Sequence, residues 1–169
     1  MFHGWDGFYL MIGSASAGLI GLLFVVATLT SGRDPVTAAR GNRLYLSPTV
    51  FHFAVVLVIS AMAAAPLSAP TAAMIVAACA LAGVAASAVI TPQLRNGASA
   101  EAPHWSDLWC YGVAPGLLYL GLGAAAAMAI WSSPQRAAYG VGFVLLALLL
   151  LAIRNAWDLV TYLAPRAGG

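Results

Sequence analysis

Two charged residues, Arg154 and Asp158, lie inside the last long apolar run of the chain, in the stretch RNAWDLVTY. A charge within a membrane span costs about 2.5–3.5 kcal/mol on insertion scales, so it persists where it faces protein or water and has a partner. A spacing of four residues puts both side chains on one helix face, where they can pair. Asn155 and Tyr162 lie on or beside the same sector. His52, in an earlier apolar run, is the other polar candidate.

The composition indicates the class of protein to which these residues belong. Hydrophobic residues make up 62% of the 169 residues and charged residues 7%, whereas soluble domains carry about 25% charged residues. The net charge of +2 is small and scattered, which argues against nucleic-acid binding. Cys79 and Cys110 form no metal or redox motif. Because no nucleophile motif, phosphate loop or metal spacing is visible, we expect no enzyme, no cofactor and no metal site.

Five apolar segments are each long enough to cross a bilayer as a tilted helix, which needs about 20 residues. They run at about 7–30, 48–67, 71–90, 108–131 and 137–163. Strict alternation of apolar and polar residues is absent, so helices are favoured over strands. The prediction is an all-α bundle of five transmembrane helices in a single domain, residues 1–169. A short helix over 35–46 is expected to lie in the membrane interface.

Proline marks the expected helix boundaries. Ser47-Pro48 and Ser133-Pro134 each resemble an N-cap serine followed by proline in the first turn. Pro66 to Pro70 brackets a very short turn, which predicts an antiparallel hairpin of the second and third spans. Pro92 is expected to follow the end of the third span. Pro115-Gly116 lies inside the fourth span, where it predicts either a static kink or a gating hinge.

Arginine placement predicts the orientation, because cytoplasmic loops are enriched in positive charge. Arg136 is the one arginine in a loop that is expected on the outer side of the membrane. Five others lie in the first and third connections and the C-terminal tail: Arg33, Arg40, Arg43, Arg95 and Arg166. The N-terminus is therefore predicted outside and the C-terminus in the cytoplasm.

This orientation brings His52 and Asp158 to a similar depth. At 1.5 Å per residue, each lies about 6–8 Å inside the expected cytoplasmic end of its helix. We therefore predict one buried polar cluster that contains Arg154, Asp158, His52, Asn155 and Tyr162. The cluster is either an ion, proton or ligand site, or a buried ion pair that fixes helix packing. His52 taken alone is more typical of a hydrogen-bonded packing residue.

The first span carries small residues at helical spacing. Gly13, Ala17 and Gly21 form one stripe, and Ser14 and Gly18 form its neighbour. Such stripes let helix backbones approach closely, so they predict a helix-packing face. The sequence leaves open whether the partner helix belongs to the same chain or to another subunit.

Three stretches resemble a family of small, uncharacterised bacterial inner-membrane proteins. They are FYLMIGSASAGLIGLLFVV, SPTVFHFAVVLVISA and RNAWDLVTY. The resemblance implies a multi-pass protein of the bacterial inner membrane. It names no activity, cofactor or site residue.

Two functions are compatible with these observations. The first is a homo-oligomeric channel or small transporter that uses the polar cluster. The second is a non-catalytic accessory or assembly subunit of a larger membrane complex. The expected partners are the lipid bilayer and copies of the chain or other membrane subunits, with no nucleic acid. A channel needs polar or small residues along the full membrane depth, whereas the polar residues here gather in the predicted cytoplasmic half.

Overall fold

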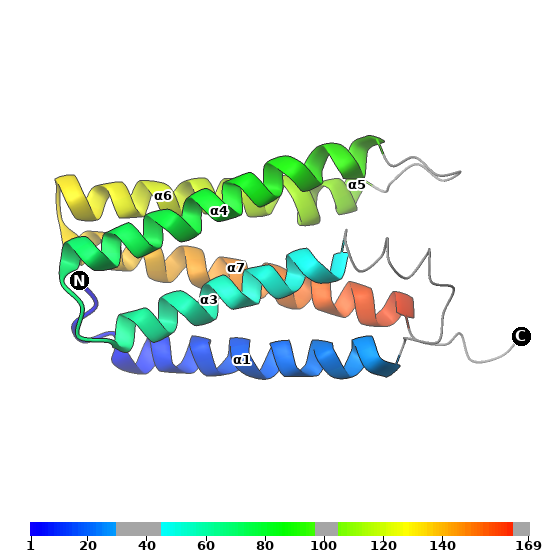
Figure 1. Ribbon diagram of the computed structural model, residues 1–169, viewed down its shortest axis with the longest axis horizontal. Coiled ribbons are helices and arrows are strands. Elements are labelled where there is room, and N and C mark those ends of the chain that lie inside the picture. The colour runs from blue at the N-terminus through cyan, green and yellow to red at the C-terminus, as the bar shows by residue number, and fades with distance from the viewer. Residues whose placement is uncertain (30–44, 97–104, 164–169) are drawn as a thin grey trace, which may run out of the picture.

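The computed structural model describes residues 1–29, 45–96 and 105–163. Its helices are α1 (Asp6–Leu29), α3 (Ser47–Ala64), α4 (Ala69–Asn96), α5 (Trp105–Asp107), the π-helix η2 (Leu108–Val113), α6 (Ala114–Trp131) and α7 (Pro134–Leu163), as Figure 1 shows. Five helical segments, with α5, η2 and α6 forming one of them, are long and apolar enough to cross a membrane. The prediction of five such helices is confirmed. The helix expected at 35–46 falls largely on residues outside the described part.

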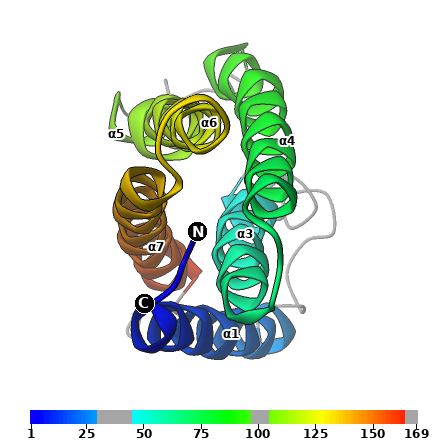
Figure 2. The same ribbon diagram turned by 90° about the vertical axis from the view of Figure 1, so that its left-hand side faces the viewer.

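The five spans form a ring. The order around the ring is α1, α3, α4, α6 and α7, and α7 packs against α1 to close it (Figure 2). In addition, α3 packs against α7 across the ring. The N-terminus and the end of α7 lie at opposite ends of the bundle (Figure 1), as an odd number of spans requires. Which end faces the cytoplasm stays a prediction.

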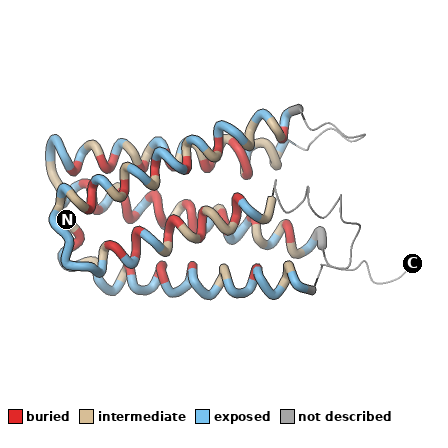
Figure 3. The backbone as a smooth tube through the Cα atoms, viewed as in Figure 1, coloured by how far each residue is buried: buried red, intermediate tan, exposed pale blue. Residues whose placement is uncertain are grey.

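The core is formed by the inward sides of helices that are apolar all round. Val56, Ile59, Leu122 and Leu145 are fully buried, and buried segments alternate with exposed ones along every helix in Figure 3. Large apolar side chains also cover the outside: Leu10, Phe24, Leu81, Phe143 and Leu150 are each more than half exposed. Such an exterior suits contact with lipid, because apolar side chains there lose nothing by facing acyl chains.

Exposed aromatic side chains mark the two ends of the bundle. Trp131 and Tyr139 are 82% and 66% exposed at one end, and Trp109 is half exposed near the other. Trp109 and Trp131 are about 33 Å apart at 1.5 Å per residue, close to the ~30 Å thickness of the hydrocarbon core. On α7, Trp157 is 71% exposed and lies near the same end of the bundle as Trp109.

Small residues let α4 and α6 pack closely. A Cβ atom added to Gly83 would overlap the Tyr119 ring, and one added to Gly112 would lie 2.7 Å from Thr91 Oγ1. The facing pairs run in antiparallel register: Ala80 with Gly123, Gly83 with Tyr119, Ser87 with Gly116, and Thr91 with Gly112. Gly112, Gly116 and Gly123 of the fourth span therefore belong to a helix-packing seam with α4.

One of the small residues of α1 packs closely on α3. A Cβ added to Gly13 would lie 2.8 Å from Ser60 Cβ, whereas one added to Gly18 or Gly21 would meet nothing within 4 Å. Ser14, Ala17, Gly18 and Gly21 are all exposed. The α1–α3 contact is completed by Ser16, whose hydroxyl donates to the Phe53 carbonyl at 2.6 Å. A partner for the exposed small residues in another subunit stays a prediction.

Helix boundaries follow the prolines in part. The turn between α3 and α4 is short, as Pro66 and Pro70 predict, and the Ser133 hydroxyl accepts a hydrogen bond from the Arg136 N–H at 3.4 Å as a cap. Pro92, however, lies inside α4, which continues to Asn96. A membrane helix tolerates proline because neighbouring groups satisfy the freed carbonyl. Ser47 is the first residue of α3, and Leu46 takes the N-cap position in its place.

Candidate functional site

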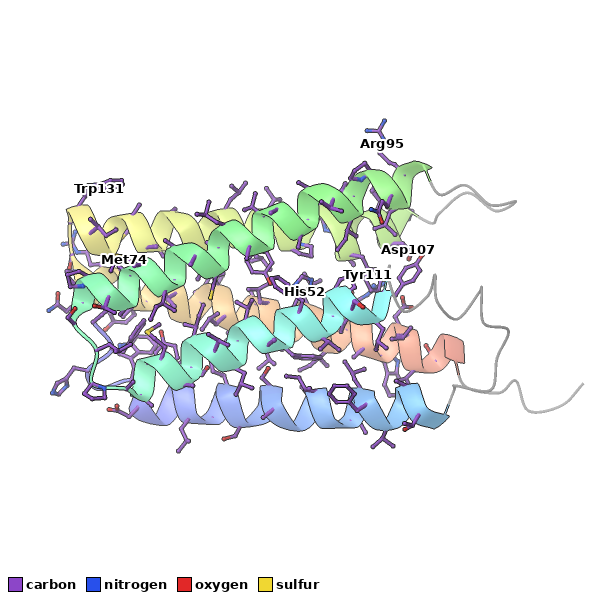
Figure 4. The ribbon with its side chains drawn as sticks, viewed as in Figure 1. His52, Met74, Arg95, Asp107, Tyr111 and Trp131 are labelled. Carbon is purple, nitrogen blue, oxygen red and sulfur yellow. The ribbon has the colours of Figure 1, made fainter. Side chains whose placement is uncertain are left out.

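His52 is a buried polar residue of the bundle interior. Its side chain is 3% exposed, and its Nδ1 lies 2.8 Å from the Tyr119 hydroxyl. Among the described residues, its Nε2 has no hydrogen-bond partner. Figure 4 places His52 and Tyr111 between the helices, toward the end that carries Arg95 and Asp107. A buried ring nitrogen without a partner costs free energy unless a ligand or water satisfies it.

A pocket of about 300 Å³ lies beside this ring. Its lining comes from α3, α4 and η2: Ser47, Pro48, Phe51, His52, Ala86, Ser87, Ile90 and Tyr111. The wall is mostly apolar, and its polar residues are His52, Ser47, Ser87 and Tyr111. Phe51, Ala86 and Ile90 are partly exposed, whereas His52 and Ser87 are buried. The His52 pocket is at the small end of the usual range for ligand sites and has their usual composition.

Tyr111 connects the pocket to α7. Its hydroxyl lies 2.9 Å from the carbonyl oxygen of Asn155 and 3.3 Å from Asp158 Oδ2, and it can donate to either. In return, the Asn155 side-chain amide donates to the Cys110 carbonyl at 3.0 Å. Asn155 is fully buried. Two reciprocal hydrogen bonds therefore join η2 and α7 and fix the Tyr111 ring in the pocket wall.

The π-helix explains why Asn155 is needed. The Ala114 N–H donates to the Trp109 carbonyl, five residues back, so it does not donate to Cys110, its partner in an α-helix. The next residue, Pro115, has no N–H to offer. The Cys110 carbonyl therefore lacks a donor from its own helix, and Asn155 supplies one across the bundle.

The Arg154–Asp158 pair lies at the surface of the bundle. Arg154 Nη1 is 3.8 Å from Asp158 Oδ2, and the two side chains are 41% and 49% exposed. Arg154 also donates to the Asn155 side-chain oxygen at 3.2 Å. The prediction of a buried pair is therefore wrong for the single chain, because both side chains lie on a side of α7 that is partly open to the outside of the bundle.

The predicted cluster is divided into two parts. Among the described residues, no hydrogen bond or ion pair joins His52 to Arg154 or Asp158. Tyr111 lies between the parts, since it lines the His52 pocket and contacts Asp158. The side chain of Tyr162 lies outside the described part of the structure.

Tyr111 and Tyr119 are site residues that the sequence reasoning missed. Both are tyrosines within the fourth span and at most 2% exposed. A buried tyrosine hydroxyl usually finds a hydrogen-bond partner. A tyrosine deep in an apolar span was therefore a usable signal that a polar group of another helix lies opposite.

No protein-family model, curated protein or solved structure matches this chain. Within the described residues, no three His, Cys, Asp or Glu side chains gather as a metal site would require.

Proposed function

We propose that this chain is a multi-pass protein of the bacterial inner membrane that binds a small amphipathic molecule in the His52 pocket, as the substrate site of a small transporter. The observation that carries the proposal is the pocket itself. It combines a mostly apolar wall with a few polar residues, His52 and two serines, the combination by which ligand sites fix orientation. Its volume suits a molecule of one or two rings.

A transporter fits this geometry better than a channel. The pocket lies toward one end of the bundle, whereas the N-terminal residues cover the other end (Figure 2). There Phe2 and Trp5 are packed edge-to-face against Tyr9 and Tyr139, with ring centroids 4.9 Å apart in each pair. A channel needs a continuous path. Passage through one chain would therefore require the helices to rearrange.

Filling the pocket tests the binding proposal. Ala86 lines the pocket, and Ala85 next to it is exposed on the outside of α4. Ala86→Leu should remove the rise in melting temperature that small aromatic probes give the purified protein, whereas Ala85→Leu should retain it. If the two variants respond alike, the pocket is not the binding site.

A flux measurement tests the preference for a transporter. Proteoliposomes loaded with the pH indicator pyranine receive an external pH jump. The pH difference should decay no faster than in empty liposomes, because no open path is expected. A faster decay that Ala86→Leu blocks would favour a channel.

The exposed small residues of α1 favour a second function, that of an accessory or assembly subunit. Gly18 and Gly21 leave room for another helix backbone, since a Cβ at either position meets nothing within 4 Å. Replacing both by leucine should reduce the size of the detergent-solubilised particle if α1 contacts another subunit or a second copy. An unchanged particle size would mean that this face of α1 contacts lipid and not another subunit.

A further inference from the structure

We propose that the His52 pocket opens sideways into the bilayer, and that its ligand is a small uncharged molecule dissolved in the membrane, which enters between α3 and α4. This inference rests on the proposed binding function and specifies the ligand class and its route of entry. Two properties of the lining residues lead to it: which of them are exposed, and how deep in the membrane they lie.

The lining residues divide into a floor and a rim. Four are buried and form the floor: Pro48, His52, Ser87 and Tyr111. The floor faces the inside of the ring of helices, since His52 contacts Tyr119 of α6 and Tyr111 contacts Asn155 of α7. Three are partly exposed and form the rim: Phe51 on α3, and Ala86 and Ile90 on α4. The opening of the pocket therefore lies between α3 and α4.

The rim belongs to the outer surface of the bundle. α3 and α4 are neighbours in the ring of helices (Figure 2), and α4 packs far more extensively on α6 than on α3. On α4, the positions beside the rim are exposed on the outside of the bundle: Ala82, Ala85 and Val89. The rim therefore continues the apolar exterior of the bundle.

The rim also lies at the depth of the hydrocarbon core. Trp109 is half exposed near this end of the bundle, where an exposed tryptophan marks the membrane interface. Ser87 packs against Gly116, which lies inward from Trp109 by about 10 Å at 1.5 Å per residue. Ala86, next to Ser87, is therefore at the level of the acyl chains, and Ile90 is one turn closer to the interface. Acyl chains, and not water, meet the rim at this depth.

The lining favours an uncharged ligand. None of the lining residues has a fixed charge, and most of the wall is apolar. An ion would lose its hydration there without gaining a counter-charge, which is costly in an apolar site. A pocket of about 300 Å³ that opens at acyl-chain depth suits a small molecule that partitions into the bilayer.

Nitroxide labels on the full chain in liposomes test the opening. Ile90→Cys places a label on the rim, and Val89→Cys places one on the adjacent exposed position as the matched control. Both carry Cys79→Ala and Cys110→Ala. Oxygen concentrates in the bilayer, whereas nickel-EDDA stays in water. We expect the Ile90 label to collide with oxygen about as often as the Val89 label, and with nickel-EDDA as rarely. Phe51→Cys, on the opposite rim, gives the same test if the Ile90 variant does not fold.

Two probes with the same rings test the ligand class. 1-Naphthol is neutral and partitions into the bilayer, whereas naphthalene-1-sulfonate is charged and stays in water. 1-Naphthol should lower the oxygen collision rate of the Ile90 label and leave that of the Val89 label unchanged, because the bound molecule fills the groove beside the rim. Adding Ala86→Leu should abolish this protection. The sulfonate should give none.

The outcomes distinguish this inference from the function on which it rests. If nickel-EDDA reaches the Ile90 label more than the Val89 label, or if the sulfonate protects it as well as 1-naphthol, the pocket opens to water and the inference is wrong. It is also wrong if neither reagent reaches the Ile90 label. In these cases the melting temperatures of Ala86→Leu and Ala85→Leu with the probes decide the binding function separately. If oxygen reaches the label and 1-naphthol gives no protection, the groove holds only lipid and both proposals fail.

Discussion

Replacing Asn155 by valine should destabilise the protein by removing the donor that satisfies the Cys110 carbonyl. That bond is 3.0 Å long and joins α7 to η2. A buried carbonyl left without a donor costs about 1–3 kcal/mol in soluble proteins. Measured side-chain hydrogen bonds in a membrane protein average about 0.6 kcal/mol and reach about 1.7. We therefore expect Asn155→Val to lower the free energy of unfolding by about 1–2 kcal/mol.

The cause can be separated from simple repacking by restoring the missing donor in the helix itself. Pro115→Ala supplies a backbone N–H and lets the segment return to α-helical pairing, in which the Ala114 N–H reaches Cys110. The cost of Asn155→Val should then fall by about 1 kcal/mol. Any packing penalty of valine, and the loss of the Arg154 contact to the Asn155 side chain, appear in both backgrounds and cancel in the cycle.

The measurement is reversible unfolding in mixed detergent micelles for the wild type, both single variants and the double variant. Circular dichroism and aromatic fluorescence should report the same transition, since the cycle requires two-state behaviour. An Asn155→Val cost that is the same with Pro115 and with Ala at that position would refute the reasoning. The N–H at position 115 would then not be the donor that the Cys110 carbonyl lacks.

Three further outcomes are expected. Gly13→Ala should cost about 1–3 kcal/mol by overpacking, because its Cβ would lie 2.8 Å from Ser60 Cβ, whereas Gly21→Ala should leave the melting temperature unchanged or slightly higher. A thermal shift assay compares the two, and equal losses would contradict the close approach. A double-mutant cycle of Arg154→Met and Asp158→Leu should give a coupling below about 1 kcal/mol, because the pair is half exposed; a coupling of several kcal/mol would mean that the pair is buried in an assembly. Reporter fusions should place the N-terminus outside and the C-terminus in the cytoplasm, and the reverse would overturn the orientation taken from the arginines.

The sequence predicted part of the candidate site. Asn155 and His52 were recognisable because polar side chains within apolar spans are rare. Their partners were not, since Tyr119 is 67 positions from His52 and Cys110 is 45 positions from Asn155. Arg154 and Asp158 could be paired from their spacing, but their exposure depends on which side of α7 faces the other helices. No local pattern contains that information.

The sequence by itself determined that this chain consists of five apolar helices with a tight turn between the second and third. Span length and proline positions are local properties, and a bilayer allows an apolar segment little choice but a helix. Only the tertiary structure decided which side of each helix turns inward. Helices that are apolar all round have no polar face to mark the outside, so their orientation follows from close contacts such as Gly83 on Tyr119. The His52 pocket depends on those contacts, because its walls come from three segments that are separate in the sequence.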